Sequence, residues 1–156
     1  MRVLMDADCL IKLTKAKLKE DVCMNFSVVI PYLVKQETVD NGGAHPDALI
    51  IKENIGKKLL SVSKASHCGT KGEDALFSIY KHGNFNAICS DDKKFIKKLR
   101  FFDVPYITPS VFIVILLKER ILNIKEASEK LNALSPYISD DEFHTVKLVL
   151  ENWRLQ

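Results

Sequence analysis

Short apolar segments alternate with longer helix-patterned segments over the first two thirds of this chain, and this alternation most constrains how it can fold. The apolar segments have strand length and are residues 2–5, 27–30, 59–62, 86–89 and 104–107. Strands that alternate with helices imply a parallel sheet covered by helices on both faces. The sequence therefore predicts an α/β fold with three layers, helix on sheet on helix.

Apolar residues at helical spacing mark the segments between these strands. The predicted helices cover residues 9–19, 32–39, 46–57, 70–82 and a lysine-rich stretch that begins at Asp91 and Asp92. Thr70 and Glu73 have the spacing of a capping box, in which each side chain bonds the other residue's backbone N–H.

From Pro109 onward the pattern is wholly helical, with helices predicted at residues 110–121, 124–134 and 140–153. Ser139 and Glu142 have the spacing of a second capping box. A segment of this size would bury only a thin core by itself. We therefore expect a single domain over residues 1–156, with an α/β core at 1–108 and a helical extension at 109–156 packed on it.

Composition excludes some classes of protein. Of the 156 residues, 47% are hydrophobic and 28% are charged, which is typical of a soluble globular domain. The net charge of +3 permits a nucleic-acid partner without indicating one. The four cysteines show no CxxC spacing, and the apolar run at 111–117 is too short to span a bilayer. We expect reduced thiols, a cytoplasmic protein and no membrane partner.

Acidic residues stand at four positions along the predicted core: Asp6, Glu37, the pair Glu73 and Asp74, and the pair Asp91 and Asp92. The first and last follow predicted strands, and ligands of parallel sheets bind beyond the carboxyl ends of the strands. Carboxylates gathered from distant segments repel one another unless a cation lies among them. Oxygen-only ligands suit Mg²⁺ or Mn²⁺. The pattern indicates metal-dependent phosphodiester chemistry.

These motifs together resemble the PIN-domain family of metal-dependent nucleases, which includes toxins of prokaryotic toxin–antitoxin pairs. The family opens with a strand that ends in Asp before an apolar helix, as at residues 3–11, and its second acid follows Pro and Val, as Glu37 does here. Its last acid lies in a turn after an apolar strand, like residues 90–95. The Gly72-Glu73 start and residues 137–143 resemble one subgroup with Gly-Glu and Asp-Asp motifs. The resemblance covers nearly the whole chain.

The resemblance implies a three-layer PIN-like fold and a Mg²⁺- or Mn²⁺-dependent ribonuclease. It also implies RNA as substrate, an antitoxin protein as partner and a homodimer, for which the apolar helix at 111–117 offers a surface if it is not core. The implied catalytic residues are Asp6, Glu37, Glu73, Asp74 and Asp92, and the implied metal ligands are Asp6, Glu37, Asp74, Asp91 and Asp92. Lys93 and Lys94 would bind substrate phosphates.

Within each acidic pair the sequence leaves the choice open. The turn motif favours Asp92 over Asp91, and the interval between the third and fourth acids then favours Asp74. The Gly-Glu pattern of the subgroup favours Glu73 instead, although Glu73 also has a structural explanation as the capping partner of Thr70.

Simpler interpretations apply to single residues. Asp6, Asp91 and Asp92 are also suited to stabilise helix N-termini, and the lysines after Asp92 also fit a solvated helix face.

Two other functions compete with the nuclease. Asp6 and Asp8 after a strand resemble the haloacid-dehalogenase phosphatases, but Cys9 and Leu10 follow where that family has Gly and Thr. A PIN-like scaffold that binds RNA or protein but cleaves poorly is the other alternative.

Overall fold

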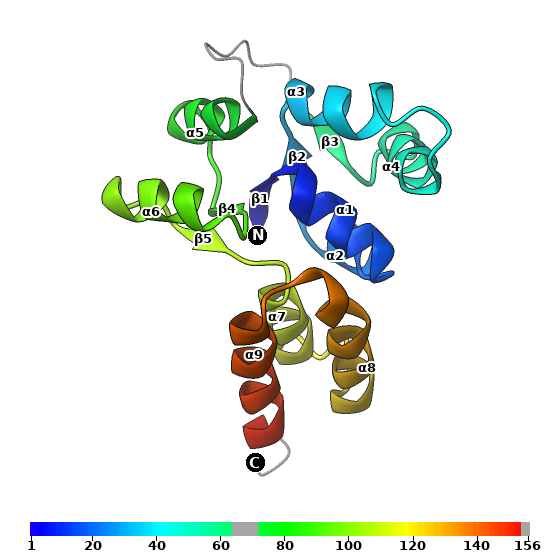
Figure 1. The fold of residues 1–156 in the computed structure, drawn as a ribbon, viewed down its shortest axis with the longest axis vertical. Helices are drawn as coiled ribbons and strands as arrows, with labels where there is room; N and C mark the ends of the chain where they lie inside the picture. Colours follow the sequence, from blue (N-terminus) through cyan, green and yellow to red (C-terminus); the bar gives the residue numbers. More distant parts are fainter. Residues whose placement is uncertain (64–71, 154–156) are drawn as a thin grey trace.

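The computed structural model describes residues 1–63 and 72–153. Within these ranges, five strands form one sheet in the order β3-β2-β1-β4-β5, and every neighbouring pair is parallel (Figure 1). The α/β class predicted from the sequence is therefore confirmed. The strands are β1 (Arg2–Met5), β2 (Ser27–Ile30), β3 (Ser61–Val62), β4 (Ala87–Cys89) and β5 (Tyr106–Ile107).

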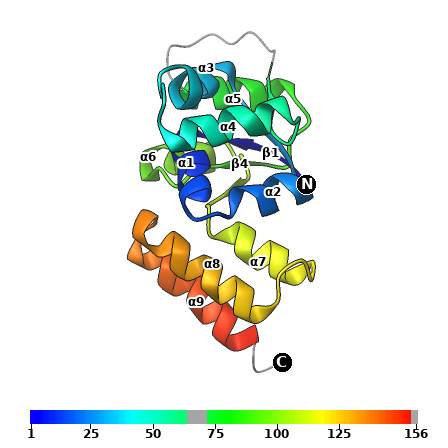
Figure 2. The same cartoon turned by 90° about the vertical axis from the view of Figure 1, so that its right-hand side faces the viewer.

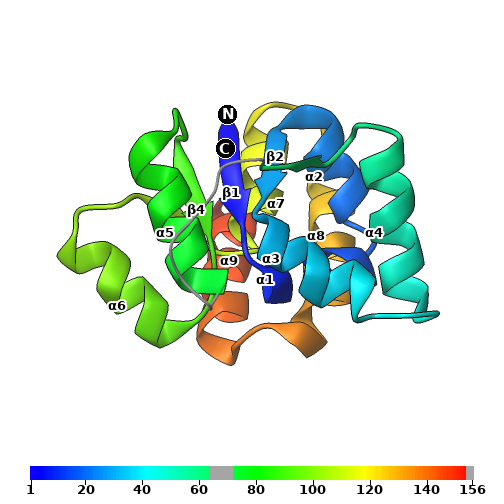
Figure 3. The same cartoon turned by 90° about the horizontal axis from the view of Figure 1, so that it is seen from above.

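The side chains of β1 show how both faces of the sheet are buried. Val3 and Met5 belong to one hydrophobic cluster and Leu4 belongs to another, because successive side chains of a strand point to opposite faces. Helices α5 and α6 cover the face of Leu4, and the remaining helices lie on the face of Val3 (Figure 3). The central strands β1, β2 and β4 can be apolar over most of their length because their residues are buried on both faces of the sheet.

Apart from α2, which was not predicted, the helices of the core lie close to the predicted segments. They are α1 (Ala7–Lys15), α2 (Lys19–Asn25), α3 (Tyr32–Lys35) with the π-helical turn η1 (Gln36–Asp40), α4 (Pro46–Gly56), α5 (Gly72–His82) and α6 (Lys93–Phe101). Within the described ranges, no helix is both long enough and apolar enough to cross a membrane.

The helical extension consists of α7 (Val111–Lys118), α8 (Ile124–Leu134), the short 3₁₀ helix η2 (Ser135–Tyr137) and α9 (Asp140–Trp153). The predicted bounds of α8 and α9 are confirmed, whereas α7 is shorter than predicted. These helices lie together beyond α1 and α2 (Figure 2).

The apolar helix α7 belongs to the core rather than to a free surface. Phe112, Ile113 and Leu116 are fully buried in the same cluster as Val3, and the ring of Phe112 lies 5.5 Å from that of Phe26. A homodimer would therefore need a different surface.

The predicted helix at residues 9–19 is wrong at its end, and a second helix that was not predicted begins at Lys19. Helix α1 ends at Lys15, Lys17 has a positive φ of 53°, and α2 then begins at Lys19. A left-handed residue ends a helix, but glycine usually occupies that position. The sequence has lysine there, so no local signal marks the break.

The predicted capping box of α9 is only half formed. The backbone N–H of Glu142 donates to Ser139 Oγ at 3.3 Å, but the Glu142 carboxylate does not return the bond. It accepts instead from the backbone N–H and the hydroxyl of Ser110, at 3.0 and 2.6 Å. A complete capping box joins Asn123 and Glu126 at the start of α8. The box predicted at Thr70 lies outside the described residues.

We expect the helical extension and the sheet to unfold as one unit because they share a hydrophobic cluster. Leu116→Ala should lower the free energy of unfolding by about 2–5 kcal/mol, the usual cost of deleting a buried leucine side chain. The control Leu148→Ala removes a side chain of α9 that is 60% exposed, and it should change stability by less than about 0.5 kcal/mol.

Urea denaturation followed by circular dichroism and by the fluorescence of Trp153, the one tryptophan of the chain, tests this expectation. Coincident transitions indicate a single unit. A fluorescence transition at lower urea than the circular-dichroism transition would show that the extension unfolds separately.

Candidate active site

The centre of the sheet contains a topological switch point. The chain builds β2 and β3 on one side of β1 and then returns to place β4 and β5 on the other side. Open α/β sheets bind ligands at such a point, beyond the carboxyl ends of the two central strands. Met5 pairs with Cys89, so Asp6 and Ser90 leave the sheet side by side, and the backbone N–H of Asp6 donates to Cys89 O at 3.1 Å.

Asp6 is held firmly at this point. It is the N-cap of α1, and its Oδ1 accepts from the Cys9 backbone N–H at 2.7 Å. Burial raises the pKa of Asp6, and the nearby Asp91 charge adds to this effect, while hydrogen bonds from Ser90 and Cys9 oppose it. The carboxylate is thus fixed in position but costly to ionise in the absence of a cation.

Glu37 reaches the same region from a distorted helix. Helix α3 widens into the π-helical turn η1, in which the Thr38 hydroxyl donates to Val34 O at 2.8 Å. A side-chain carbon at Gly72 would lie 3.7 Å from both carboxylate oxygens of Glu37, which shows that the start of α5 lies against this side chain. Single π-helical turns occur often at functional sites.

A pocket of about 420 Å³ collects carboxylates from four separate segments. No basic side chain lines it among the residues that the structure describes; its lining is Asp6, Ala7, Asp8, Val34, Glu37, Gly72, Glu73 and Asp92. An adjoining pocket of about 430 Å³ shares three of these acids and adds basic groups; its lining is Asp6, Asp8, Lys12, Asp91, Asp92, Lys93 and Lys94. The fold therefore places an anionic pocket beside a mixed one.

The structure separates the two members of the later acidic pair. Asp91 Oδ2 lies 2.6 Å from Lys12 Nζ, and Asp8 Oδ2 lies 3.2 Å from the same ammonium group. Asp92 lines both pockets, and its Oδ1 caps α6 by accepting from the Phe95 N–H at 2.7 Å. Asp92 is consequently better placed than Asp91 to meet a cation, as the turn motif had suggested.

The earlier acidic pair is separated in the same way. Glu73 lines the anionic pocket, whereas Asp74 points to α6 and pairs with Lys98 at 2.9 Å. The sequence interval had favoured Asp74, and the Gly-Glu pattern had favoured Glu73. The position of the side chains supports Glu73.

The donors around the anionic pocket suit a hard divalent cation in their chemistry, because all of them are carboxylate oxygens. In residues 1–63 and 72–153, however, no three acidic, histidine or cysteine side chains converge closely enough to hold a metal ion. Like charges without a cation between them repel, so side chains that stand apart are what electrostatics predicts for this arrangement. The residues fit such an ion by type and location, and binding would require the carboxylates to come closer together.

Two residues that the sequence did not single out contribute to the site. Lys12 compensates Asp91, and its only sequence signal was its spacing four residues after Asp8. Ser90 is fully buried, accepts from the Asp92 N–H at 3.3 Å and bonds the Asp6 carboxyl group. Serine after a strand is too common to indicate this role. The predicted substrate lysines, Lys93 and Lys94, are exposed beside these groups.

Two of the buried thiols, those of Cys9 and Cys89, lie near Asp6 and Asp91. Cys9, Cys23 and Cys89 are buried and free, and Cys68 lies outside the described residues. Burial raises the pKa of all three thiols, that of Cys23 to about 11. They are therefore protonated at neutral pH and unsuited to act as nucleophiles or metal ligands.

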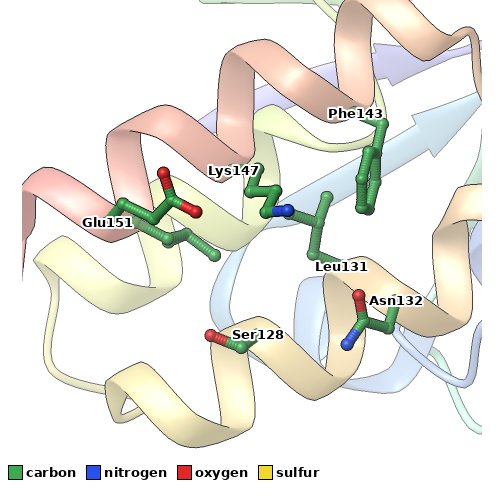
Figure 4. Close-up of a pocket in the computed structure, with 7 residues that line it drawn as sticks. Ser128, Leu131, Asn132, Phe143, Lys147 and Glu151 are labelled. Carbon is green, nitrogen blue, oxygen red and sulfur yellow. The ribbon is translucent and has the colours of Figure 1, made fainter.

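A third pocket lies between α8 and α9, far along the chain from the acids (Figure 4). It has a volume of about 150 Å³ and is lined by Ser128, Leu131, Asn132, Phe143, Lys147, Leu150 and Glu151. Pockets for small-molecule ligands usually exceed about 300 Å³. The anionic pocket is therefore the better candidate for a functional site.

Comparison with the models of known protein families gave no match for this chain, and a search of curated proteins likewise found none that matches it.

Replacing Asp6 tests the cost of its buried charge. Asp6→Asn keeps an oxygen for the Cys9 N–H but removes the charge, so it should raise the free energy of unfolding at pH 7.5 by about 1 kcal/mol when no metal is added. Because the pKa of Asp6 is raised in the folded protein, its ionised carboxylate lowers the stability of the wild type by the full amount at pH values above that pKa. This loss of stability disappears as the pH falls through the raised value toward the ordinary 3.8, where wild-type Asp6 also becomes neutral.

Urea denaturation of both proteins at pH 7.5 and at lower pH measures the difference. The matched control is Asp92→Asn, because Asp92 caps α6 in the same way but is exposed to solvent. The control should show no gain. Equal behaviour of the two variants would contradict a special cost of ionising Asp6.

Proposed function

We propose that this protein is a PIN-like, metal-dependent nuclease that hydrolyses phosphodiester bonds in RNA. The observation that carries the proposal is the pocket at the switch point, where carboxylates from four separate segments face one space without a basic side chain among its described lining residues. A purely structural role for these acids would be expected to pair them with cations. Asp91 and Asp74 are paired in that way, and so is Asp8, which lies 3.2 Å from Lys12 Nζ. Among the described residues, no cationic side chain forms an ion pair with Asp6, Glu37, Glu73 or Asp92.

The residues of the site would have two roles, to bind the metal ion and to orient the residues that bind it. Asp6, Glu37, Glu73 and Asp92 would hold Mg²⁺ or Mn²⁺, which supplies an activated water and neutralises charge on the scissile phosphate. Ser90 and the Cys9 N–H orient Asp6, and the Phe95 N–H orients Asp92, so two of the donors are fixed before any ligand arrives. Fixed donors reduce the cost of assembling the site.

The mixed pocket supports a nucleic-acid substrate. Lys93 and Lys94 extend from the first turn of α6 beside Asp92, where phosphates flanking the scissile bond would lie. Lysines in this position would contribute affinity without reading sequence. The choice of RNA, a role as the toxin of a toxin–antitoxin pair, a homodimer and a cytoplasmic location rest on the resemblance to PIN-domain proteins.

One observation favours a second candidate, a PIN-like scaffold that binds RNA or protein without efficient cleavage. Asp6 and Asp92 each cap a helix, and the acids of the pocket do not converge in the described residues. The two candidates differ in metal binding, which a catalytic site requires and a scaffold does not. The phosphatase alternative would use Asp6 and Asp8 and would leave Glu37 and Glu73 without a role.

Metal should stabilise the wild-type protein and support cleavage. Mn²⁺ at about 100 times its dissociation constant should add about 2.7 kcal/mol to the free energy of unfolding, and labelled RNA should be cut with Mn²⁺ but not with EDTA. Asp6→Asn should lose most of the stabilisation and at least about 100-fold of the cleavage rate, because it removes a donor at the centre of the site.

Calorimetric titration and gel analysis of the labelled RNA measure these two effects. Asp141→Asn, an exposed acid of α9, is the control and should behave like the wild type. Metal binding that persists in Asp6→Asn would place the site elsewhere. Absence of binding in the wild type would favour the scaffold, and hydrolysis of a small phosphate monoester that depends on Asp6 and Asp8 would favour the phosphatase.

The acidic pair at the start of α5 gives an internal comparison. Glu73→Gln should lower the metal-dependent cleavage rate at least about tenfold, as loss of a group near a metal usually does. Asp74→Asn should change it by no more than about fivefold, because a half-exposed ion pair is worth at most about 1 kcal/mol. Cleavage kinetics of the two variants decide between them, and a larger loss in Asp74→Asn would restore the interval-based choice of Asp74.

A further inference from the structure

An exposed aromatic cluster lies at the end of α6 opposite to the acidic pocket. Phe77 of α5 and Phe102 have ring centroids 5.0 Å apart, and Phe101 meets Phe102 edge-on at the same distance. Helices α5 and α6 lie together on one face of the sheet (Figure 3). We call Phe77, Phe101 and Phe102 the aromatic platform.

Two of the three rings of the platform are open to solvent, and Phe77 is partly buried. The side chain of Phe101 is 80% exposed and that of Phe102 is 47% exposed, whereas Phe95 on the inner side of the same helix is 1% exposed. Single exposed apolar residues are ordinary, but adjacent exposed aromatic rings form a patch of the kind that binds ligands.

Two lysines lie over the faces of Phe77 and Phe102. Lys81 Nζ lies 4.6 Å from the centroid of Phe77 and 5.3 Å from that of Phe102, and Lys98 Nζ lies 5.3 Å from the centroid of Phe77. The acids nearby are Asp74, which is paired with Lys98, and Asp103, which follows the platform in the chain. Aromatic faces interleaved with ammonium groups suit a ligand that has both flat rings and negative charge.

Helix α6 connects the platform to the pocket. Lys93 lines the mixed pocket, Lys97 is exposed one turn later, and Phe101 is exposed one turn after that. Eight residues of α-helix span about 12 Å. A strand whose bases stack at about 3.4 Å per nucleotide would cover this path with about three nucleotides.

We propose that the aromatic platform is a binding surface for single-stranded RNA, on which bases about three nucleotides from the scissile phosphate stack. This inference rests on the proposed function for its direction, since α6 leads from the anionic pocket to the platform. Phe101 supplies the main stacking surface, Lys97 contacts the intervening phosphate, and Lys81 and Lys98 support the platform from beneath. A duplex would not bind in this way because its bases are already stacked on one another.

Fluorescence anisotropy of a fluorescein-labelled oligouridine of about 12 nucleotides, in EDTA so that nothing is cleaved, tests this surface. Phe101→Ala should weaken binding about 5- to 100-fold, the usual effect of losing one stacking ring. Phe101→Trp should bind at least as well as the wild type, and Phe101→Leu should bind as poorly as Phe101→Ala. The control Leu148→Ala removes a comparably exposed apolar side chain of α9 and should have no effect.

Salt dependence separates the two kinds of contact. Lys97→Ala should reduce the slope of log affinity against log salt by about one, whereas Phe101→Ala should leave the slope unchanged. Unchanged RNA affinity in Phe101→Ala, or equal affinity for a duplex of the same length, would overturn the proposal. Loss of self-association in Phe101→Ala without loss of RNA binding would assign the platform to a second copy of the chain instead.

The cleavage assay distinguishes RNA binding by the aromatic platform from RNA cleavage at the anionic pocket. If the wild type does not cleave RNA but binds it through Phe101, the nuclease proposal fails and the platform remains. If the wild type cleaves RNA and Phe101→Ala cleaves and binds equally well, the nuclease remains and the platform fails. If the wild type cleaves RNA and Phe101→Ala binds RNA more weakly, Phe101→Ala should cut a dinucleotide at the wild-type rate and lose cleavage efficiency only on longer strands.

Discussion

The parallel pairing of β1 with β4 is the constraint on which the site depends. These strands are far apart in the sequence, and their pairing brings the residue after Met5 beside the residue after Cys89. Asp6 and Asp92 thereby come to the same edge of the sheet, each fixed by the N-terminal turn of the helix that follows it. Without this pairing the acids would be unrelated helix caps. With it, both carboxylates line one pocket.

The acids at this edge of the sheet differ in whether a lysine compensates their charge. Lysines on neighbouring helices compensate Asp91 and Asp74, while Glu37, Glu73, Asp6 and Asp92 line the anionic pocket. The compensated acids hold helices together, because Lys12 belongs to α1 and Lys98 belongs to α6. One member of each acidic pair therefore forms an ion pair with a lysine, and the other member lines the anionic pocket.

Helix α6 combines two environments in nine residues. The N-cap Asp92 and the first-turn residues Lys93 and Lys94 line the pockets, and Phe101 at the end of the helix is exposed, as is Phe102 directly after it. Phe95 and Leu99 anchor the inner side of the helix in the core. The opposite face of the sheet is stabilised differently. There α7 packs its apolar side chains inward, and Glu142 of α9 accepts hydrogen bonds from Ser110 at the start of α7.

The sequence by itself determined the α/β class, the alternation of five strands with helices along the core, the bounds of α8 and α9 and the residues from which a site could be built, because these follow from local periodicity and capping. Only the tertiary structure decided the rest. It placed a left-handed residue at Lys17, which separates α1 from α2, turned Glu142 toward Ser110, and set Lys12 against Asp91. It also directed Glu73 into the pocket and Asp74 away from it. Adjacent residues on a helix point about 100° apart, so the choice between them depends on where the helix packs, which no local pattern encodes.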